Sequence, residues 1–595
     1  MLWPSTTPAW GNIGSGKREA GVTQGDSTPV RYRTLNHLHA RAAGWSRPAS
    51  GFLSQPEPRS IGLFARGRQL IAGNFLFAGH LVEAPGLSLW DIAVPDTAFE
   101  DEIQGFGWLD DLAAVGDGAA RKRAQDWTWG WIDRFGGGKG PGWTPDLTGR
   151  RIIRWINHAL LLLNSRNRTE ADAYFRALSR QTVFLSRRWH SAAPGLPRFE
   201  ALTGLIYAGL SLQGMDRHVG QARVALAREC EREIDSSGGL PGRNPEELLL
   251  VFSLLTWAAQ ALTEAGRRPE PGHVEAIERI APTLRSLRHA DGGLARFHGG
   301  GRGMEGRLDQ ALASSGVKPG GAPTGMAMGF ARLSGGRSSV IVDAASPPAR
   351  SGAAHASTLA FELTSGRRPL IVNCGSGAPF GPDWRRAGRA TASHSTLTID
   401  GYSSSRFGSG NRDQLVDLAE VCDGLLAGRP SGTTFTASHT GWSATHGLQH
   451  QRRLDLSQDG RRLVGEDSLL AISETEQRRF AQALAQTRPL GVRYQVRFHL
   501  HPDVDAEVDM GGTALSLALR SGELWVLRFT GAVELGLEPS VYLEKGRLKP
   551  RASRQIVLSG LATTPETRIG WTLAKAQDTP LAIRDLDRDD APASS

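Results

Sequence analysis

The first half of the chain repeats apolar residues every three or four positions, which is the spacing of helices that bury one face. The pattern runs from about Ser60 to about Leu287, and short loops rich in glycine and proline interrupt it. Such a series of helices favours helical hairpins wound round an axis. One predicted helix begins at Gly105, and the others cover residues 119–135, 149–163, 170–189, 197–214, 217–234, 245–265 and 273–290.

Beyond Phe330 the hydrophobic period changes to two, which is typical of strands. Turn residues separate the segments, and hardly a helix is expected among them. This half therefore predicts an all-β antiparallel sandwich of many strands. The predicted strands are 338–344, 357–363, 369–373, 395–400, 452–457, 461–470, 492–501, 505–510, 515–520, 523–529, 540–545, 554–560 and 568–574.

These patterns divide the chain into two domains with flanking segments. Residues 1–55 are expected to be disordered or extended, and residues 56–300 to form the helical domain. A glycine-rich linker over 301–328 leads into the sandwich at 329–577, and a frayed tail follows at 578–595.

Composition narrows the class of protein. The net charge is +9, so polyanions are plausible partners, yet no nucleic-acid module or zinc-finger spacing is present. No apolar run approaches the roughly 18 residues of a membrane span. The first residues lack the apolar core of a signal peptide, which favours a cytoplasmic location. Three distant cysteines argue against a disulfide framework.

The stretch 355–400 concentrates polar chemistry at the ends of three predicted strands. His355 is expected to open the first strand, Asn373 to close the second and His394 to open the third. In an antiparallel sheet these ends can lie side by side, where they could bind a metal ion or an anionic sugar.

The same stretch resembles the C-terminal half of the heparinase II/III family of polysaccharide lyases. The resemblance is carried by an ordered series of residues: His355, Asn373, Gly375, Trp384, Arg385, His394, Thr396, Asp400 and Gly401. It implies a multidomain α + β fold, with an N-terminal incomplete (α/α) toroid followed by the β-sandwich. It also implies a groove between them that binds acidic polysaccharide, and it gives the periplasm or cell envelope as the alternative location.

The resemblance further implies β-elimination at a uronic acid. A base removes the C5 proton, and an acid, often a tyrosine, protonates the leaving oxygen. Some relatives hold one zinc ion in the sandwich, which here would fall to His355, Asn373 and His394. Where active relatives carry His-x-His, this chain has Ala353-Ala354-His355, and Asn373 stands where an aspartate is usual. Structural, zinc-binding and catalytic roles all stay open for the three residues.

Candidates for the remaining roles come from the helical half and from the motif. His394, Tyr207, Asn157 and His158 are the candidate catalytic residues, although core packing is the ordinary explanation for polar groups on apolar helices. Two Gly-Gly loops carry donors for a carboxylated sugar, with helix termination as the alternative role. With the Trp384–Arg385 pair, the candidate substrate-binding residues are Arg243, Asn244, Arg296, His298, Trp384 and Arg385.

Two functions follow from the sequence. The first is a polysaccharide lyase that acts on uronate-rich chains. The second is a catalytically impaired carbohydrate-binding or envelope-associated protein on the same fold, since a fold does not fix a function. A homodimer is allowed as the assembly.

Overall fold

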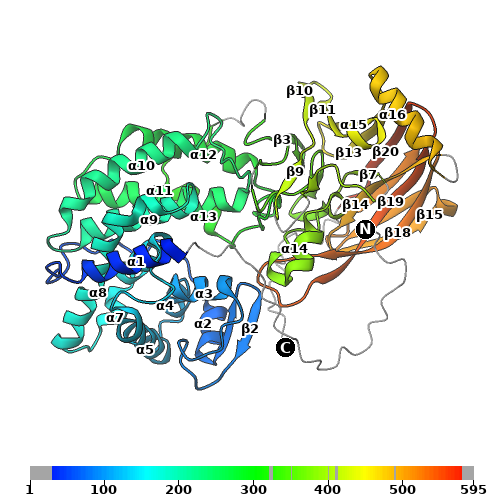
Figure 1. The fold of residues 1–595 in the computed structure, drawn as a ribbon. Coiled ribbons are helices and arrows are strands. Elements are labelled where there is room, and N and C mark those ends of the chain that lie inside the picture. The colour runs from blue at the N-terminus through cyan, green and yellow to red at the C-terminus, as the bar shows by residue number, and fades with distance from the viewer. Residues whose placement is uncertain are drawn as a thin grey trace. The chain divides into compact units, whose positions relative to one another are not determined.

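The computed structural model describes residues 30–320, 326–349, 351–399, 401–408, 413–487 and 491–578. The chain forms two compact units, one of residues 1–226 and 257–269 and the other of residues 227–256 and 270–595. Helices dominate the first half and strands the second (Figure 1).

The first unit is helical. Its core is aromatic, because Trp108, Trp127, Trp131, Trp143 and Trp155 are at most 1% exposed. Its elements are α1 (Val30–Ala43), α2 (Phe64–Ile71), β1 (Asn74–Phe77), β2 (His80–Glu83), α3 (Thr97–Gln104), α4 (Trp108–Val115), α5 (Gly118–Phe135), α6 (Pro145–Asn157), α7 (Ala159–Leu163), α8 (Arg168–Arg188) and α9 (Leu196–Ser211). Helices α10 (Val219–Glu233) and α11 (Pro245–Glu264) contribute residues to both units.

Helices α6 and α9 approach closely because glycines face each other. A Cβ atom on Gly149 would lie 2.2 Å from the carbonyl oxygen of Glu200, and one on Gly204 would lie 2.5 Å from the Cα of Gly149. Only residues without side chains allow this contact.

The second unit contains strands β3 to β20 and, before them in the chain, the helices α12 (Pro271–Ser286) and α13 (Arg307–Ser314). One sheet has the order β10-β11-β12-β13-β20-β17-β16-β15, and the other has the order β18-β19-β14-β6-β5-β4-β3, with β7 paired to β14. Each pairing is antiparallel. A separate pair is formed by β8 (Arg406–Phe407) and β9 (Leu415–Asp417).

The strand bounds are β3 (Phe330–Gly335), β4 (Ser338–Asp343), β5 (Phe361–Ser365), β6 (Arg368–Val372), β7 (Leu397–Ile399), β10 (Val421–Arg429), β11 (Gly432–Trp442), β12 (Leu448–Ser457), β13 (Arg462–Leu470), β14 (Val492–Leu500), β15 (Val504–Asp509), β16 (Ala514–Leu519), β17 (Leu524–Thr530), β18 (Val533–Tyr542), β19 (Arg551–Ala562) and β20 (Glu566–Gln577).

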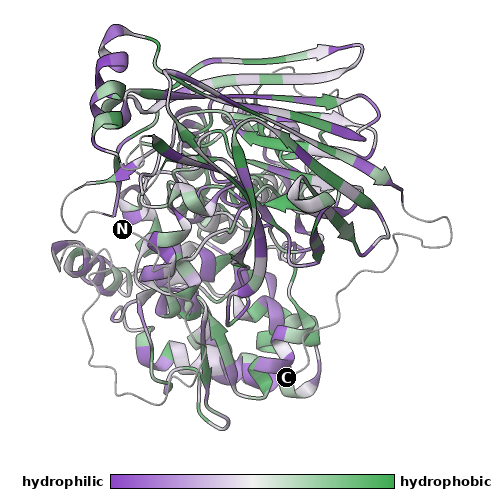
Figure 2. Ribbon diagram, turned by 90° about the vertical axis from the view of Figure 1, so that its right-hand side faces the viewer, coloured by the Kyte–Doolittle hydropathy of each residue, from purple (hydrophilic) through white to green (hydrophobic). Residues whose placement is uncertain are grey.

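The two sheets enclose an apolar core. Phe361 of one sheet stacks on Trp571 of the other, with ring centroids 5.8 Å apart and planes 7° from parallel. Figure 2 shows hydrophobic and hydrophilic bands alternating along the long strands, as expected where one face of each sheet is buried.

The structure corrects several expectations about the elements. Within 1–55, residues 30–43 form α1, and residues 1–29 lie outside the described part. The expected linker holds α13, and residues 579–595 of the expected tail also lie outside the description. The helix expected over 149–163 begins at Pro145 and is interrupted at His158, whose backbone is not helical.

Among the described residues, three helices interrupt the strand-rich half: α14 (Pro382–Gly388), α15 (Ser443–His446) and α16 (Glu474–Ala485). Strands β10 and β11 were not predicted. β10 is an edge strand without buried residues, so its sequence lacks alternation.

Among the described helices, only α11 is long and apolar enough to cross a membrane by length and composition. In its apolar window 67% of the residues are buried inside the protein, as in the core helix of a folded domain.

Candidate functional site

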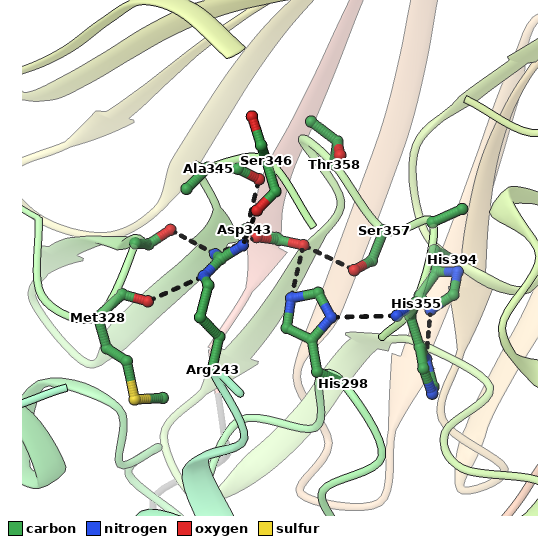
Figure 3. Close-up of polar contacts among 12 residues, drawn as sticks. Arg243, His298, Met328, Asp343, Ala345, Ser346, His355, Ser357, Thr358 and His394 are labelled. Atoms are coloured by element: carbon green, nitrogen blue, oxygen red, sulfur yellow. Dashed lines mark hydrogen bonds and ion pairs between the residues drawn. The ribbon is translucent and has the colours of Figure 1, made fainter. Parts of the chain in front are cut away.

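A buried ion pair between Arg243 and Asp343 forms the centre of the polar cluster in the second unit (Figure 3). Arg243 lies in the loop before α11, and Asp343 is the last residue of β4. The Asp343 side chain is 0% exposed and Arg243 is 8% exposed. The cluster therefore joins a loop of the helical region to the end of a strand.

The guanidinium of Arg243 donates all of its hydrogen bonds within the protein. Besides Asp343 Oδ1, it reaches the carbonyl oxygens of Gly329 at 2.7 Å, Ser346 at 2.8 Å, Met328 at 3.1 Å and Ala345 at 3.2 Å. Five N–H groups thus meet five acceptors. Arg243 was expected to bind substrate, but this arrangement leaves it no donor for a sugar carboxylate.

The second oxygen of Asp343 faces two further polar groups. Ser357 Oγ donates to Oδ2 at 2.6 Å, and His298 Nε2 lies 3.3 Å from it. Burial works to raise the pKa of Asp343, but the charge of Arg243, together with His298 and Ser357, holds that pKa well below its ordinary value. Asp343 is therefore a permanent anion.

Three histidines continue the cluster, and their neighbours define their tautomers. The backbone N–H of His355 donates to His298 Nδ1 at 3.2 Å, so the proton of neutral His298 is on Nε2, facing Asp343. His394 Nδ1 lies 2.8 Å from the Ala390 carbonyl and must donate to it. Its Nε2 then accepts from His355 Nδ1 at 3.0 Å.

This assignment leaves His355 Nε2 without a proton. No hydrogen-bond partner of this nitrogen lies among the described residues, and His355 is 2% exposed. Burial lowers the pKa of His394 to about 4 and also lowers the pKa values of His355 and His298. The three rings are therefore neutral at pH 7, and His355 presents a bare nitrogen lone pair.

The expected strand positions are only partly observed. His355 lies in an irregular segment before β5, which begins at Phe361, because Leu359 turns the chain with φ of +60°. Asn373 directly follows β6, as expected, and its Oδ1 accepts from the backbone N–H of Ser395 at 2.9 Å.

The fit of a zinc ion to His355, Asn373 and His394 can be judged from these contacts. His394 Nε2 and Asn373 Oδ1 both accept hydrogen bonds within the protein. In the described ranges no group of three or more His, Cys, Asp or Glu is placed to hold a metal. This donor set does not fit zinc as arranged, since the ion would have to replace both hydrogen bonds. The zinc site stays a prediction.

The other predicted substrate-binding residues have structural partners. Asn244 Oδ1 accepts from the backbone N–H groups of Glu246 and Glu247 and so caps α11. Arg296 Nη2 donates to the carbonyls of Cys374 and Leu543, and its Cζ lies 4.0 Å from the Tyr542 ring centre.

The motif pair on α14 is more accessible. Trp384 is half-buried, and Arg385 is exposed, with its Nη2 2.9 Å from Asp413 Oδ2. A substrate role for this pair stays a prediction.

The catalytic candidates of the helical half lie in the first unit. His158 Nε2 is 2.8 Å from Asp110 Oδ1, and Asn157 is 2% exposed. Tyr207 is fully buried, which raises its pKa to about 12, and its hydroxyl lies 3.4 Å from Arg59 Nη1. These positions fit core residues, and a catalytic role for them stays a prediction.

A second buried cluster supports the backbone beside His394. Asp467 accepts from both Arg452 and His450, and Arg452 Nη1 donates to the carbonyls of Leu359 and Ser395 at 2.8 and 2.9 Å. One arginine thereby fixes the two segments that flank the His355–His394 pair.

Sequence reasoning missed Asp343, Ser357 and Asp467. Asp343 lies one residue before the end of the predicted apolar strand 338–344, which is a usable signal for a polar group at a strand end. Its partner Arg243 is 100 positions away, so no local spacing could connect them.

Comparisons with known proteins agree with the fold. Residues 318–572 match the family model "Heparinase II/III-like, C-terminal". Among solved structures, heparinase III aligns with a TM-score of 0.64 and 12% identity over 91% of this chain and 90% of its own. Heparan sulfate lyase HepC from Pedobacter heparinus aligns with a TM-score of 0.55 and 14% identity over 92% and 89%.

Residues 318–572 are therefore similar to the C-terminal domain of heparinase II/III-like proteins, and the predicted fold of an α/α toroid followed by a β-sandwich is confirmed. The curated relative "FtsZ-localized protein C" from Caulobacter vibrioides (strain NA1000 / CB15N) is 29% identical over 569 residues. The match spans 91% of this chain and 96% of the relative.

We expect Asp343→Asn to destabilise the protein by about 3–5 kcal/mol, because it leaves the Arg243 charge buried without its counter-ion. Denaturant unfolding followed by circular dichroism measures the change. The control is Glu474→Gln, which removes an exposed i,i+4 pair with Arg478 and should cost under about 0.5 kcal/mol. Equal effects of the two substitutions would show that the ion pair contributes no more than a surface one.

We expect stability to fall as the pH drops from 6.5 towards 4. The folded-state pKa of His394 is about 4 against 6.5 for a free histidine, so its contribution is complete above pH 6.5 and is lost through that window. The loss is on the order of 3 kcal/mol for this residue. Unfolding curves at several pH values test it, and His394→Asn, which can keep the bond to Ala390, should flatten the slope. An unchanged slope in that variant would contradict the assignment.

Proposed function

We propose that this chain is an FtsZ-associated protein that uses the heparinase fold as a scaffold rather than as a lyase. The observation that carries the proposal is the match with FtsZ-localized protein C, which covers 91% of this chain and 96% of that relative. A relationship that extends over both halves supports a shared role for the whole chain. The cytoplasmic location expected from the sequence is part of the proposal.

The buried cluster supports the scaffold role. The arginine that could neutralise a sugar carboxylate uses all five of its donors within the protein. Tyr207, the candidate acid, is fully buried and its pKa is raised to about 12. A lyase needs both groups to contact its substrate. In this chain the contacts of Arg243 and Tyr207 are within the protein, where they stabilise the fold.

We expect the purified chain to sediment with assembled FtsZ of Caulobacter vibrioides and to stay in solution without it. Heparinase III is the matched control, because it aligns over the same length at only 12% identity and should remain in the supernatant. If the chain also remains in the supernatant at every protein concentration, the association with FtsZ is wrong.

A polysaccharide lyase is the second candidate, and the bare Nε2 of His355 favours it. This nitrogen has the protonation state of a base that could remove the C5 proton of a uronate. The substrate would be an acidic, uronic-acid-containing polysaccharide of the glycosaminoglycan type. Elimination also needs an acid at the leaving oxygen, a role that the sequence assigned to Tyr207.

We expect no rise in ultraviolet absorbance when the protein is incubated with heparan sulfate, heparin, chondroitin, alginate or bacterial uronate exopolysaccharides. Elimination would create an unsaturated uronate that absorbs, and heparinase III serves as the positive control. A rise that disappears in His355→Ala would instead establish the lyase and identify its base.

A further inference from the structure

One end of the β-sandwich carries a group of arginines whose function nothing above assigns. The turns of the hairpins β3–β4, β5–β6, β10–β11 and β12–β13 lie there. The arginines of these turns are exposed or half-buried, and together they form the arginine cluster: Arg337, Arg367, Arg368, Arg429, Arg461 and Arg462. In the sequence of the turns, which are residues 335–338, 365–368, 429–432 and 457–462, Asp459 is the only acid.

Hydrogen bonds place these turns side by side. The Gly366 N–H donates to the Arg337 carbonyl at 2.8 Å, and a backbone hydrogen bond of 3.0 Å joins the β10–β11 turn to the β12–β13 turn. Ser338 Oγ donates to the Gly460 carbonyl at 2.7 Å, which connects turns of the two different sheets. The arginines therefore belong to one continuous surface.

The turn sequences explain why arginines gather at this end. Gly336, Gly366 and Gly460 have φ angles of 49°, 55° and 69°, which tight hairpin turns favour and glycine permits. An arginine directly follows each of these glycines. Each of these arginines is therefore fixed where the chain turns back into the sandwich.

The acids beside the cluster do not balance its charge. Asp459 Oδ1 accepts from the Arg461 N–H at 3.0 Å and so holds its own turn. Glu523 is 4% exposed, and it is bonded to Ser365 Oγ at 2.6 Å and to Lys575 Nζ at 3.0 Å. The positive residues outnumber the acids at this surface, so it favours an acidic partner.

The chain itself supplies an acidic segment next to this surface. Strand β20 ends at Gln577, and Asp578 pairs with Arg461 of the cluster. Residues 579–595, which lie outside the described part, read TPLAIRDLDRDDAPASS. The acids of this acidic tail are Asp585, Asp587, Asp589 and Asp590.

The starting point and length of the acidic tail bring it within reach of the cluster. The Lys575 N–H donates to the Arg461 carbonyl at 2.8 Å, so β20 leaves its sheet beside the β12–β13 turn. The stretch from Asp578 to Asp590 can span about 40 Å when extended. Neighbouring strands are only about 5 Å apart and packed sheets about 10 Å apart. The aspartates can therefore reach each turn of the cluster.

We propose that the acidic tail docks on the arginine cluster, with the aspartates of residues 585–590 paired to its guanidinium groups. Exposed ion pairs are individually weak, but the covalent tether gives the tail a high effective concentration at this surface. Any other acidic partner of the cluster must then displace the tail. The surface lies wholly within the second unit, and the proposal does not depend on association with FtsZ.

Limited trypsin digestion of the full chain tests the docking, because trypsin cleaves after Arg584 and Arg588 of the tail. An isotope-labelled peptide of residues 579–595 in the same reaction gives the rate for the undocked sequence, and mass spectrometry follows the cleavage of both. We expect the tail of the full chain to be cleaved about tenfold more slowly at low salt, since the tether supplies a millimolar effective concentration. Salt at about 1 M, which screens exposed charges, should abolish the difference.

Arg461→Gln and Arg462→Gln should each reduce this protection about threefold, since each removes an exposed ion pair. Arg568→Gln is the matched control, because it removes the same charge from an exposed position near the other end of β20, and its tail should be cleaved like that of the parent.

A variant of the tail keeps the test independent of the folded domain. Asp587→Asn, Asp589→Asn and Asp590→Asn in one chain leave every residue of the cluster unchanged. Compared with a labelled peptide of its own sequence, this tail should lose most of its protection, because the aspartates that pair with the arginines are gone.

Three results would overturn the proposal. One is an equal cleavage rate for the tail of the full chain and for the free peptide at low salt. Another is that Arg461→Gln and the aspartate variant keep the same protection as Arg568→Gln. The third is protection that rises with protein concentration, which would place the tail on a second copy of the chain.

Discussion

The ion pair between Arg243 and Asp343 is the interaction on which the second unit depends. Transferring two charges out of water costs several kcal/mol per ion, and this cost is offset only where every remaining donor and acceptor is bonded. Arg243 meets that condition with four carbonyl oxygens, and Asp343 accepts from Ser357 and lies 3.3 Å from His298 Nε2. The carbonyls come from the two ends of the β3–β4 hairpin. The pair therefore fixes that hairpin to the loop before α11.

A similar arrangement of an ion pair and histidines lies in the other sheet of the sandwich, on β11, β12 and β13. Asp467 is an anion bonded to Arg452, and His450 and His439 continue from it as Asp343 continues into His298. The Gly441 N–H donates to His439 Nδ1, so His439 must donate to His450 and His450 to Asp467. In both clusters a charged pair is surrounded by neutral histidines, whose pKa values burial lowers. Such networks rigidify a core when every member is bonded.

The helical and strand-rich halves of the fold were predictable because each has its own period of hydrophobic residues. The change from a period of three or four residues to a period of two near Phe330 separated helices from strands, and the motif of the strand-rich half indicated the family model that residues 318–572 match. The closeness of His355 and His394 was also expected, since both flank strands of one sheet. The partners of these residues were not predictable, because Asp343 and Arg243 are brought together only by the complete fold. The expectation that Arg243 binds substrate assumed a guanidinium with free N–H groups. In the folded chain all five of these groups donate to acceptors within the protein.

One physical explanation covers both the unbonded nitrogen of His355 and the internally bonded guanidinium of Arg243. A catalytic residue must keep an unbonded donor or lone pair, and this leaves polar groups unsatisfied at a cost in stability. In the cluster of the second unit, Arg243, Asp343 and His394 are bonded, and His298 Nε2 lies 3.3 Å from Asp343 Oδ2. His355 Nε2 is the lone pair that stays open. One open nitrogen provides a base, but elimination also needs a group that neutralises the carboxylate and an acid that protonates the leaving oxygen. A cluster that has bonded its cation internally gains rigidity, which agrees with the scaffold role proposed above.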